Sequence, residues 1–181
     1  MIYYIADTHF GHENSIRFDS RPFSSAEEMD RTIIEYWNSR VTGKDDVYIL
    51  GDFAFKNERP FTWYLSRLSG RKHLIVGNHD TKLLKDTEAM GFFETVEYLT
   101  TISDNNERIV LCHYPICEWN GFYHGTWHIY GHIHNDSGST FQYMSTLERA
   151  LNAGCMLNNY IPVTFAELVE NNRIFRQSRG R

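Results

Sequence analysis

The chain has 181 residues, of which 41% are hydrophobic and 23% are charged, and its formal net charge is −5 at pH 7. These values are ordinary for a soluble globular protein, and the length suits one domain covering residues 1–181. The acidic charge argues against a protein that coats nucleic acid non-specifically by charge alone. The acidic net charge does not exclude a nucleotide bound at one local site, because cations held there by acidic and imidazole groups would make the site positive.

The cysteine pattern and the first residues indicate where the protein acts. Its 3 cysteines form no CxxC pair, which favours reduced thiols in a cytosol over disulfides. The N-terminus, MIYYIADTHF, lacks the basic and long apolar segments of a signal peptide, and the longest apolar runs, about five residues, are too short to span a membrane. We therefore expect a cytoplasmic protein without membrane contact; the oligomeric state is not indicated.

The first half of the chain alternates apolar runs with helical periodicity. Two overlapping capping boxes, formed by Ser24 and Ser25 with Glu27 and Glu28, precede an apolar helical face. Strands are expected at residues 1–6, 47–50 and 73–76, and helices at 25–40, from Pro60 to Gly70, and at 82–90. Strands joined through helices are typical of a parallel sheet.

The second half is richer in expected strands. These lie at residues 95–102, 108–112, 127–130, 151–155 and 173–175, with a polar loop over 135–148. A capping box of Thr164 and Glu167 predicts a short helix through Glu170, and residues 177–181 are expected to be a frayed basic tail. Without repeats or linkers, one α/β domain is the simplest interpretation.

Polar residues of metal-binding type follow five of the apolar runs. In an open α/β sheet, ligands bind beyond the carboxyl ends of the strands, and residues two apart on extended backbone point the same way. A glycine before a ligand lets the backbone turn sharply and approach an ion. Each motif alone is typical of an ordinary turn, but together they predict a metal site. The motifs are Asp7-Thr8-His9, Gly51-Asp52, Gly77-Asn78-His79-Asp80, His113 and Gly131-His132-Ile133-His134.

In this order the motifs resemble those of the calcineurin-like metallophosphoesterase family, over about residues 5–134. The start, DTHFGHENSIRFDSRPF, resembles a small prokaryotic and phage branch of that family. The resemblance implies a four-layer α/β/β/α sandwich of two mixed sheets flanked by helices, with two divalent metal ions at one rim. It implies that Asp7, His9 and His134 bind the first ion, that Asp52 bridges both, and that Asn78, His113 and His132 bind the second. These donors suit Mn²⁺, the ion most expected in vitro, or Fe or Zn.

The same resemblance implies a mechanism. A hydroxide bridging the metals would attack a phosphate ester in line, with His79 as proton donor and Asp80 fixing the ring of His79. The residues after Gly51-Asp52 are Phe53-Ala54-Phe55-Lys56, so the phosphate-binding Asp-Arg-Gly of the family's protein phosphatases is missing. We therefore expect a small or nucleotide-like phosphodiester as substrate, and neither a phosphoprotein nor a symmetrical dinucleoside tetraphosphate.

Several points stay open at the level of sequence. Substrate contacts are expected from His12, Asn14, Arg17 and Arg21, which follow the first ligand pair. The aromatic residues of loop 114–127 could stack a nucleobase or pack as a lid. The alternatives to a phosphodiesterase are a phosphomonoesterase acting on a small substrate and a non-catalytic metal-binding scaffold on the same fold.

Overall fold

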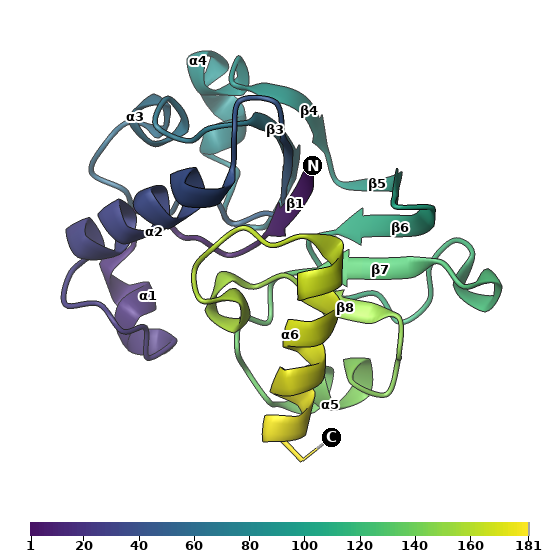
Figure 1. The fold of residues 1–181 in the computed structure, drawn as a ribbon. Helices are drawn as coiled ribbons and strands as arrows, with labels where there is room; N and C mark the ends of the chain where they lie inside the picture. Colours follow the sequence, from purple (N-terminus) through teal and green to yellow (C-terminus); the bar gives the residue numbers. More distant parts are fainter. Residues whose placement is uncertain (181) are drawn as a thin grey trace.

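The apolar runs form strands that pair into two four-stranded sheets in the computed structural model, which describes residues 1–180 (Figure 1). The first sheet is parallel throughout and has the order β1 (Ile2–Ile5), β2 (Asp46–Ile49), β3 (Arg71–Ile75) and β4 (Phe93–Glu97). The second has the order β5 (Leu99–Asp104), β6 (Glu107–Cys112), β7 (Trp127–Tyr130) and β8 (Ala150–Asn152), with only β5 antiparallel to its neighbour. The expected sandwich of two sheets flanked by helices is confirmed, although only the second sheet is mixed.

Helices cover the outer face of the first sheet. The longest, α2 (Ala26–Arg40), begins at Ser25, whose side chain accepts a hydrogen bond from the backbone of Glu28. Met29, Ile33 and Trp37 recur at four-residue spacing, are fully buried, and join the core of the first sheet. Burial of each such side chain stabilises the fold by roughly 1.5–3 kcal/mol. The other elements before β4 are α1 (Glu13–Phe18), α3 (Phe61–Leu65), η1 (Leu83–Lys85) and α4 (Thr87–Met90).

A second core lies between the sheets and beneath α6 (Phe165–Ser178). Tyr4 and Ile75 of the first sheet share it with Leu111 and Ile129 of the second, because alternate side chains of a strand face the same way. The capping box of Thr164 and Glu167 is formed, and α6 adds Phe165 and Leu168 to this core. The outer face of the second sheet is covered by α5 (Ser139–Met144) and by residues near η2 (Phe122–His124); η3 (Cys155–Asn158) follows β8.

Several sequence-based expectations for the second half were wrong. The expected strand 95–102 is two strands in different sheets, because the chain passes from the edge of one sheet to the edge of the other at Tyr98. The expected loop 135–148 contains α5. The expected strand 173–175 is part of α6, where burial of Leu168 and Asn172 at helical spacing continues the amphipathic pattern past Glu170. The tail expected at 177–181 begins inside α6, and Arg181 lies outside the described residues.

The two sheets are joined where β1 ends. The backbone N–H of Ala6 donates to the carbonyl of Ala153 at 2.9 Å, and the N–H of Cys155 donates to the carbonyl of Ala6 at 2.9 Å. This pairing places the segment after β1 beside the segment after β8, so that the carboxyl ends of strands from both sheets share one rim. None of the helices within residues 1–180 combines the length and apolar character needed to cross a membrane.

Candidate metal centre

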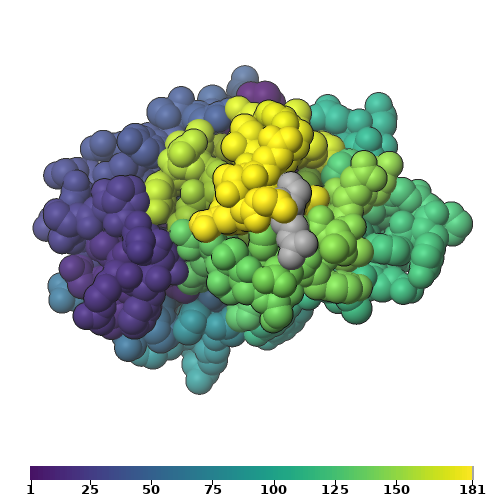
Figure 2. Space-filling view, turned by 90° about the horizontal axis from the view of Figure 1, so that it is seen from below, coloured from purple at the N-terminus to yellow at the C-terminus, as the bar shows by residue number. Residues whose placement is uncertain are grey.

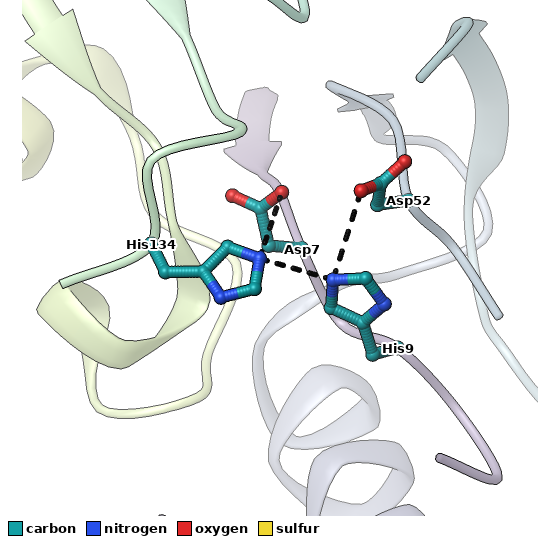
Figure 3. Close-up of side chains that lie close together, drawn as sticks. All are labelled: Asp7, His9, Asp52 and His134. Atoms are coloured by element: carbon teal, nitrogen blue, oxygen red, sulfur yellow. Dashed lines mark hydrogen bonds and ion pairs between the residues drawn. The ribbon is translucent and has the colours of Figure 1, made fainter. Parts of the chain in front are cut away.

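Four of the expected metal ligands converge at this rim. Asp7 and His9 follow β1, Asp52 follows β2 and His134 follows β7, and each offers a ligand atom within 4.8 Å of the others (Figure 3). The Nε2 atoms of His9 and His134 are 3.1 Å apart. An oxygen of Asp52 lies 3.7 Å from His9 Nε2, and an oxygen of Asp7 lies 3.8 Å from His134 Nε2. Two imidazoles and two carboxylates facing one point form a donor set that suits a divalent transition metal.

The other oxygen of Asp52 faces a second group of expected ligands. Asp52 Oδ1 lies 3.6 Å from His113 Nε2, whereas Oδ2 is the atom that faces His9. His113 Nε2 is 3.1 Å from Asn78 Oδ1, and the ring of His132 lies 5.2 Å from the ring of His113 between centroids. Asp52 therefore stands between two clusters of donor atoms, where a carboxylate shared by two cations would lie.

The backbone of the ligand segments adopts an uncommon conformation. A positive φ costs a non-glycine residue on the order of 1–3 kcal/mol, and such residues concentrate at functional sites. Eleven non-glycine residues of the described chain have positive φ, and five of them are expected metal ligands. These are Asp7 (58°), His9 (50°), Asp52 (53°), His132 (70°) and His134 (51°). This strain is concentrated at the site, which indicates that the ligand geometry is held at a cost in stability.

Two glycines make room for the ligand side chains themselves. A Cβ atom at Gly51, where φ is 79°, would lie 2.5 Å from Nδ1 of His113. A Cβ atom at Gly77 would overlap the carboxylate of Asp52. The sequence predicts that a glycine before a ligand lets the backbone approach an ion. At Gly51 and Gly77, the group that the backbone approaches within the described residues is a neighbouring ligand side chain.

Backbone and carboxylate partners orient two of the imidazoles. His113 Nδ1 lies 2.7 Å from the carbonyl of Leu50, and His134 Nδ1 lies 2.8 Å from Asp19 Oδ1. Each partner accepts the Nδ1 proton, which leaves Nε2 free to bind a cation. Burial lowers the pKa of His9 well below its usual value, so its imidazole is neutral as a ligand must be. Burial raises the pKa of Asp7 to about 6, so a cation that bound there below that pH would displace a proton.

Asp19 is a residue of the candidate site that sequence reasoning missed. It lies within the stretch DTHFGHENSIRFDSRPF, but nothing in that stretch marks it as a partner of a metal ligand, and the folded chain brings it to His134. The guanidinium of Arg21 donates to Asp19 Oδ2 at 3.0 and 2.9 Å and to the carbonyls of Asp7 and Thr8 at 3.0 and 2.9 Å. Arg21 is only 4% exposed, and these bonds occupy its guanidinium, which does not favour the expected contact with substrate. It holds the ligand segment and Asp19 in place.

The residue expected to donate a proton is partly exposed at the edge of the cluster. The side chain of His79 is 36% exposed, and its Nε2 is 4.0 Å from Asp52 Oδ2. Its ring packs against Phe55, with centroids 4.2 Å apart, and its backbone N–H donates to Asp52 Oδ1 at 2.8 Å. His79 therefore has a fixed backbone and a ring that solvent or substrate can reach.

Asp80 does not orient that ring. Its fully buried carboxylate accepts hydrogen bonds from the backbone N–H groups of Gly77, Asp52 and Phe53, at 2.8, 3.0 and 3.0 Å. Within residues 1–180 no hydrogen bond joins Asp80 to the imidazole of His79. The sequence-based role of Asp80 is thus corrected: it shapes the turns that carry Asp52 and Asn78, because buried amides must find acceptors.

The remaining substrate candidates differ in position. His12 is 8% exposed, and its ring lies 5.7 Å from that of His9 and 4.9 Å from that of Phe55. Arg17 is exposed and donates to Asn14 Oδ1 at 3.3 Å. Among the described residues, neither Asn14 nor Arg17 contacts a ligand side chain, so only His12 of these three adjoins the cluster.

No protein-family model matches the chain. A protein of Methanocaldococcus jannaschii, named "Uncharacterized protein MJ1445", is 34% identical over 180 residues, which cover 97% of this chain and 94% of that protein. The chain belongs to the family of this archaeal protein. The Gene 66 protein of Mycobacterium phage L5 is 38% identical over 82 residues, covering 43% of this chain and 39% of the phage protein.

One solved structure agrees with the fold. A protein of unknown function from Aquifex aeolicus, AQ665, has a TM-score of 0.72 at 27% identity and covers 94% of this chain and 98% of its own. The E. coli phosphoesterase Yfce matches at a TM-score of 0.42 and 13% identity, over 84% of this chain and 77% of its own. A similarity at that level does not bear on activity.

The network around Asp19 makes a first prediction. Asp19→Asn should weaken Mn²⁺ binding by about 10–100-fold, since it removes the anionic acceptor that orients His134. Titration calorimetry gives the affinity, and circular dichroism checks that the variant is folded. Asp136→Asn, a change at an exposed carboxylate that contacts only its neighbouring backbone, is the control and should bind like the wild type. Wild-type affinity in Asp19→Asn would contradict the role assigned to this network.

Proposed function

We propose that the protein is a two-metal-dependent phosphoesterase that favours phosphodiesters. The observation that carries the proposal is the position of Asp52, whose two carboxylate oxygens face two separate groups of donor atoms. The family resemblance of the motifs and the concentration of strained backbone at the ligands support the same function. Two divalent cations bound there would lower the pKa of a water and neutralise charge on a phosphate.

The side chains divide into roles around Asp52. Asp7, His9 and His134 would hold one cation, and Asn78, His113 and His132 the other. Arg21 and Asp19 fix the first group, and the carbonyl of Leu50 fixes His113. Because these partners hold the ligands before any substrate arrives, little reorganisation is needed when negative charge develops on phosphorus.

His79 is the proposed proton donor. It projects from the turn after β3, and its partly exposed ring is braced by Phe55. An alkoxide is a poor leaving group, and a proton supplied by an imidazole at the edge of the cluster lowers the barrier to its departure. His12, also packed on Phe55, is the adjacent imidazole that could contact the phosphate.

Turnover in the presence of Mn²⁺ tests the function. The wild type should hydrolyse bis-p-nitrophenyl phosphate faster than p-nitrophenyl phosphate. Asp52→Asn should lose about 10²–10³-fold in kcat, as when a single group that stabilises transition-state charge is removed. Faster hydrolysis of the monoester would favour a phosphomonoesterase. If the Mn²⁺-loaded wild type turned over neither ester, a non-catalytic metal-binding scaffold protein on the same fold would be favoured.

A series of leaving groups tests His79. General acid catalysis contributes typically 10²–10⁴-fold, and less when the leaving group is already stable as an anion. His79→Ala should therefore slow an alkyl or nucleoside diester far more than a p-nitrophenyl diester, with unchanged metal content. His124→Ala, at an exposed histidine of η2, is the control. If kcat/KM in His79→Ala depended on leaving-group pKa as in the wild type, His79 would not be the proton donor.

A further inference from the structure

A groove with a volume of about 970 Å³ opens beside the metal centre, along His132 and His134. Three segments far apart in sequence line it: the end of α1 with Phe18, the loop after β6 with Tyr114, and the segment after β7. Arg179, at the end of α6, completes the lining. Figure 2 shows the purple N-terminal segment and the green segment around 130–145 meeting beside the yellow end of α6. The volume lies at the upper end of the range of small-molecule sites.

Tyr114 presents an aromatic surface to this groove next to the metal ligands. Its ring lies 4.7 Å from the ring of His132 and 5.1 Å from the ring of His113, yet the residue is 46% exposed. Trp119 in the same loop is only 7% exposed and packs against Phe122. The loop therefore uses Trp119 for packing and leaves Tyr114 available. A planar group stacked on Tyr114 would lie beside a phosphate bound at the metal centre.

The charges along the groove limit how many further phosphates a substrate can carry beside the one at the metal centre. Arg179 is the one lysine or arginine among the described lining residues, and its guanidinium lies over the ring of Phe175 at 5.2 Å without a carboxylate partner in residues 1–180. Asp19 and Asp136 also line the groove, and both are acidic. Asp19 is already paired with Arg21 and His134, which leaves Arg179 for one further phosphate and Asp136 to disfavour a long polyanion.

We propose that the groove binds a single nucleoside esterified to the scissile phosphate, with its base stacked on Tyr114. Asn135 and Ser137 supply uncharged polar groups for the sugar, and Arg179 takes a second phosphate when the nucleoside carries one. The leaving group then lies toward His79, which is not among the described residues that line the groove. The substrate class is thus a nucleotide diester of about dinucleotide size. Its hydrolysis rests on the proposed function, whereas its binding does not.

Two diesters that share a leaving group test the base-stacking site. Methyl p-nitrophenyl phosphate and thymidine 5′-(p-nitrophenyl phosphate) differ only in the retained alcohol, so the ratio of their kcat/KM values reports the groove. The wild type should prefer the thymidine ester. Tyr114→Ala should reduce the ratio by about tenfold or more, the effect of losing one base–aromatic stack, and Tyr114→Phe should keep it. Tyr123→Ala, a 78% exposed tyrosine of the same loop outside the groove, is the matched control.

Arg179 is tested with a 3′-phosphorylated form of the thymidine ester. The added phosphate should raise kcat/KM in the wild type and give no gain in Arg179→Gln. If the added phosphate raised kcat/KM equally in the wild type and in Arg179→Gln, Arg179 would not bind that phosphate. An unchanged ester ratio in Tyr114→Ala, with the methyl ester still hydrolysed, would overturn the groove assignment as a whole.

Binding of thymidine 5′-monophosphate, followed by calorimetry on the Mn²⁺-loaded protein, separates this proposal from the proposed activity. Binding that weakens in Tyr114→Ala but not in Tyr123→Ala would support the groove even if no ester were turned over, and would then count against the phosphoesterase function alone. Hydrolysis of both esters without detectable nucleotide binding and without a preference for the thymidine ester would leave the function intact and contradict the groove.

Discussion

Two backbone hydrogen bonds at Ala6 hold the carboxyl ends of the two sheets together, and the candidate site depends on them. Ala6 donates to Ala153 and accepts from Cys155, each at 2.9 Å. The next residue, Asp7, accepts a hydrogen bond from the backbone N–H of His132, which follows a strand of the other sheet, at 3.1 Å to either oxygen. Ligands that follow β1, β2 and β3 can therefore face ligands that follow β6 and β7. Without this junction, the motifs would form two incomplete half-sites.

The fold also supports the strain stored at the site. Five expected ligands hold a left-handed backbone conformation, at a cost of about 1–3 kcal/mol each. Two cores, one beneath α2 and one between the sheets, supply the burial that offsets this cost. The buried carboxylate of Asp80 accepts from three backbone amides of the ligand turns and so fixes their shape. The ligand positions are thus set by the folded chain, which is what a preorganised site requires.

The parts of this arrangement that follow local rules could be predicted from the sequence. Apolar runs ending in Asp7, Asp52 or His113 indicated both the strands and the rim, because side-chain type and strand end are local signals. The role of Asp19 could not be predicted, because its partner His134 is distant in sequence. The buried position of Arg21 could not be predicted either, because it donates to backbone carbonyls, which no side-chain pattern reveals. The break at Tyr98 was missed for a related reason: an apolar run shows strand character but not the sheet to which each half belongs.

Anomalous diffraction from crystals grown with Mn²⁺ tests the proposal that two cations share Asp52. We expect two peaks about 3.5–4 Å apart, the usual separation in two-metal sites. One oxygen of Asp52 should coordinate each ion, with His9 and His134 on one ion and His113 on the other. A single peak, or peaks that Asp52 does not contact, would show that Asp52 is not shared by two cations.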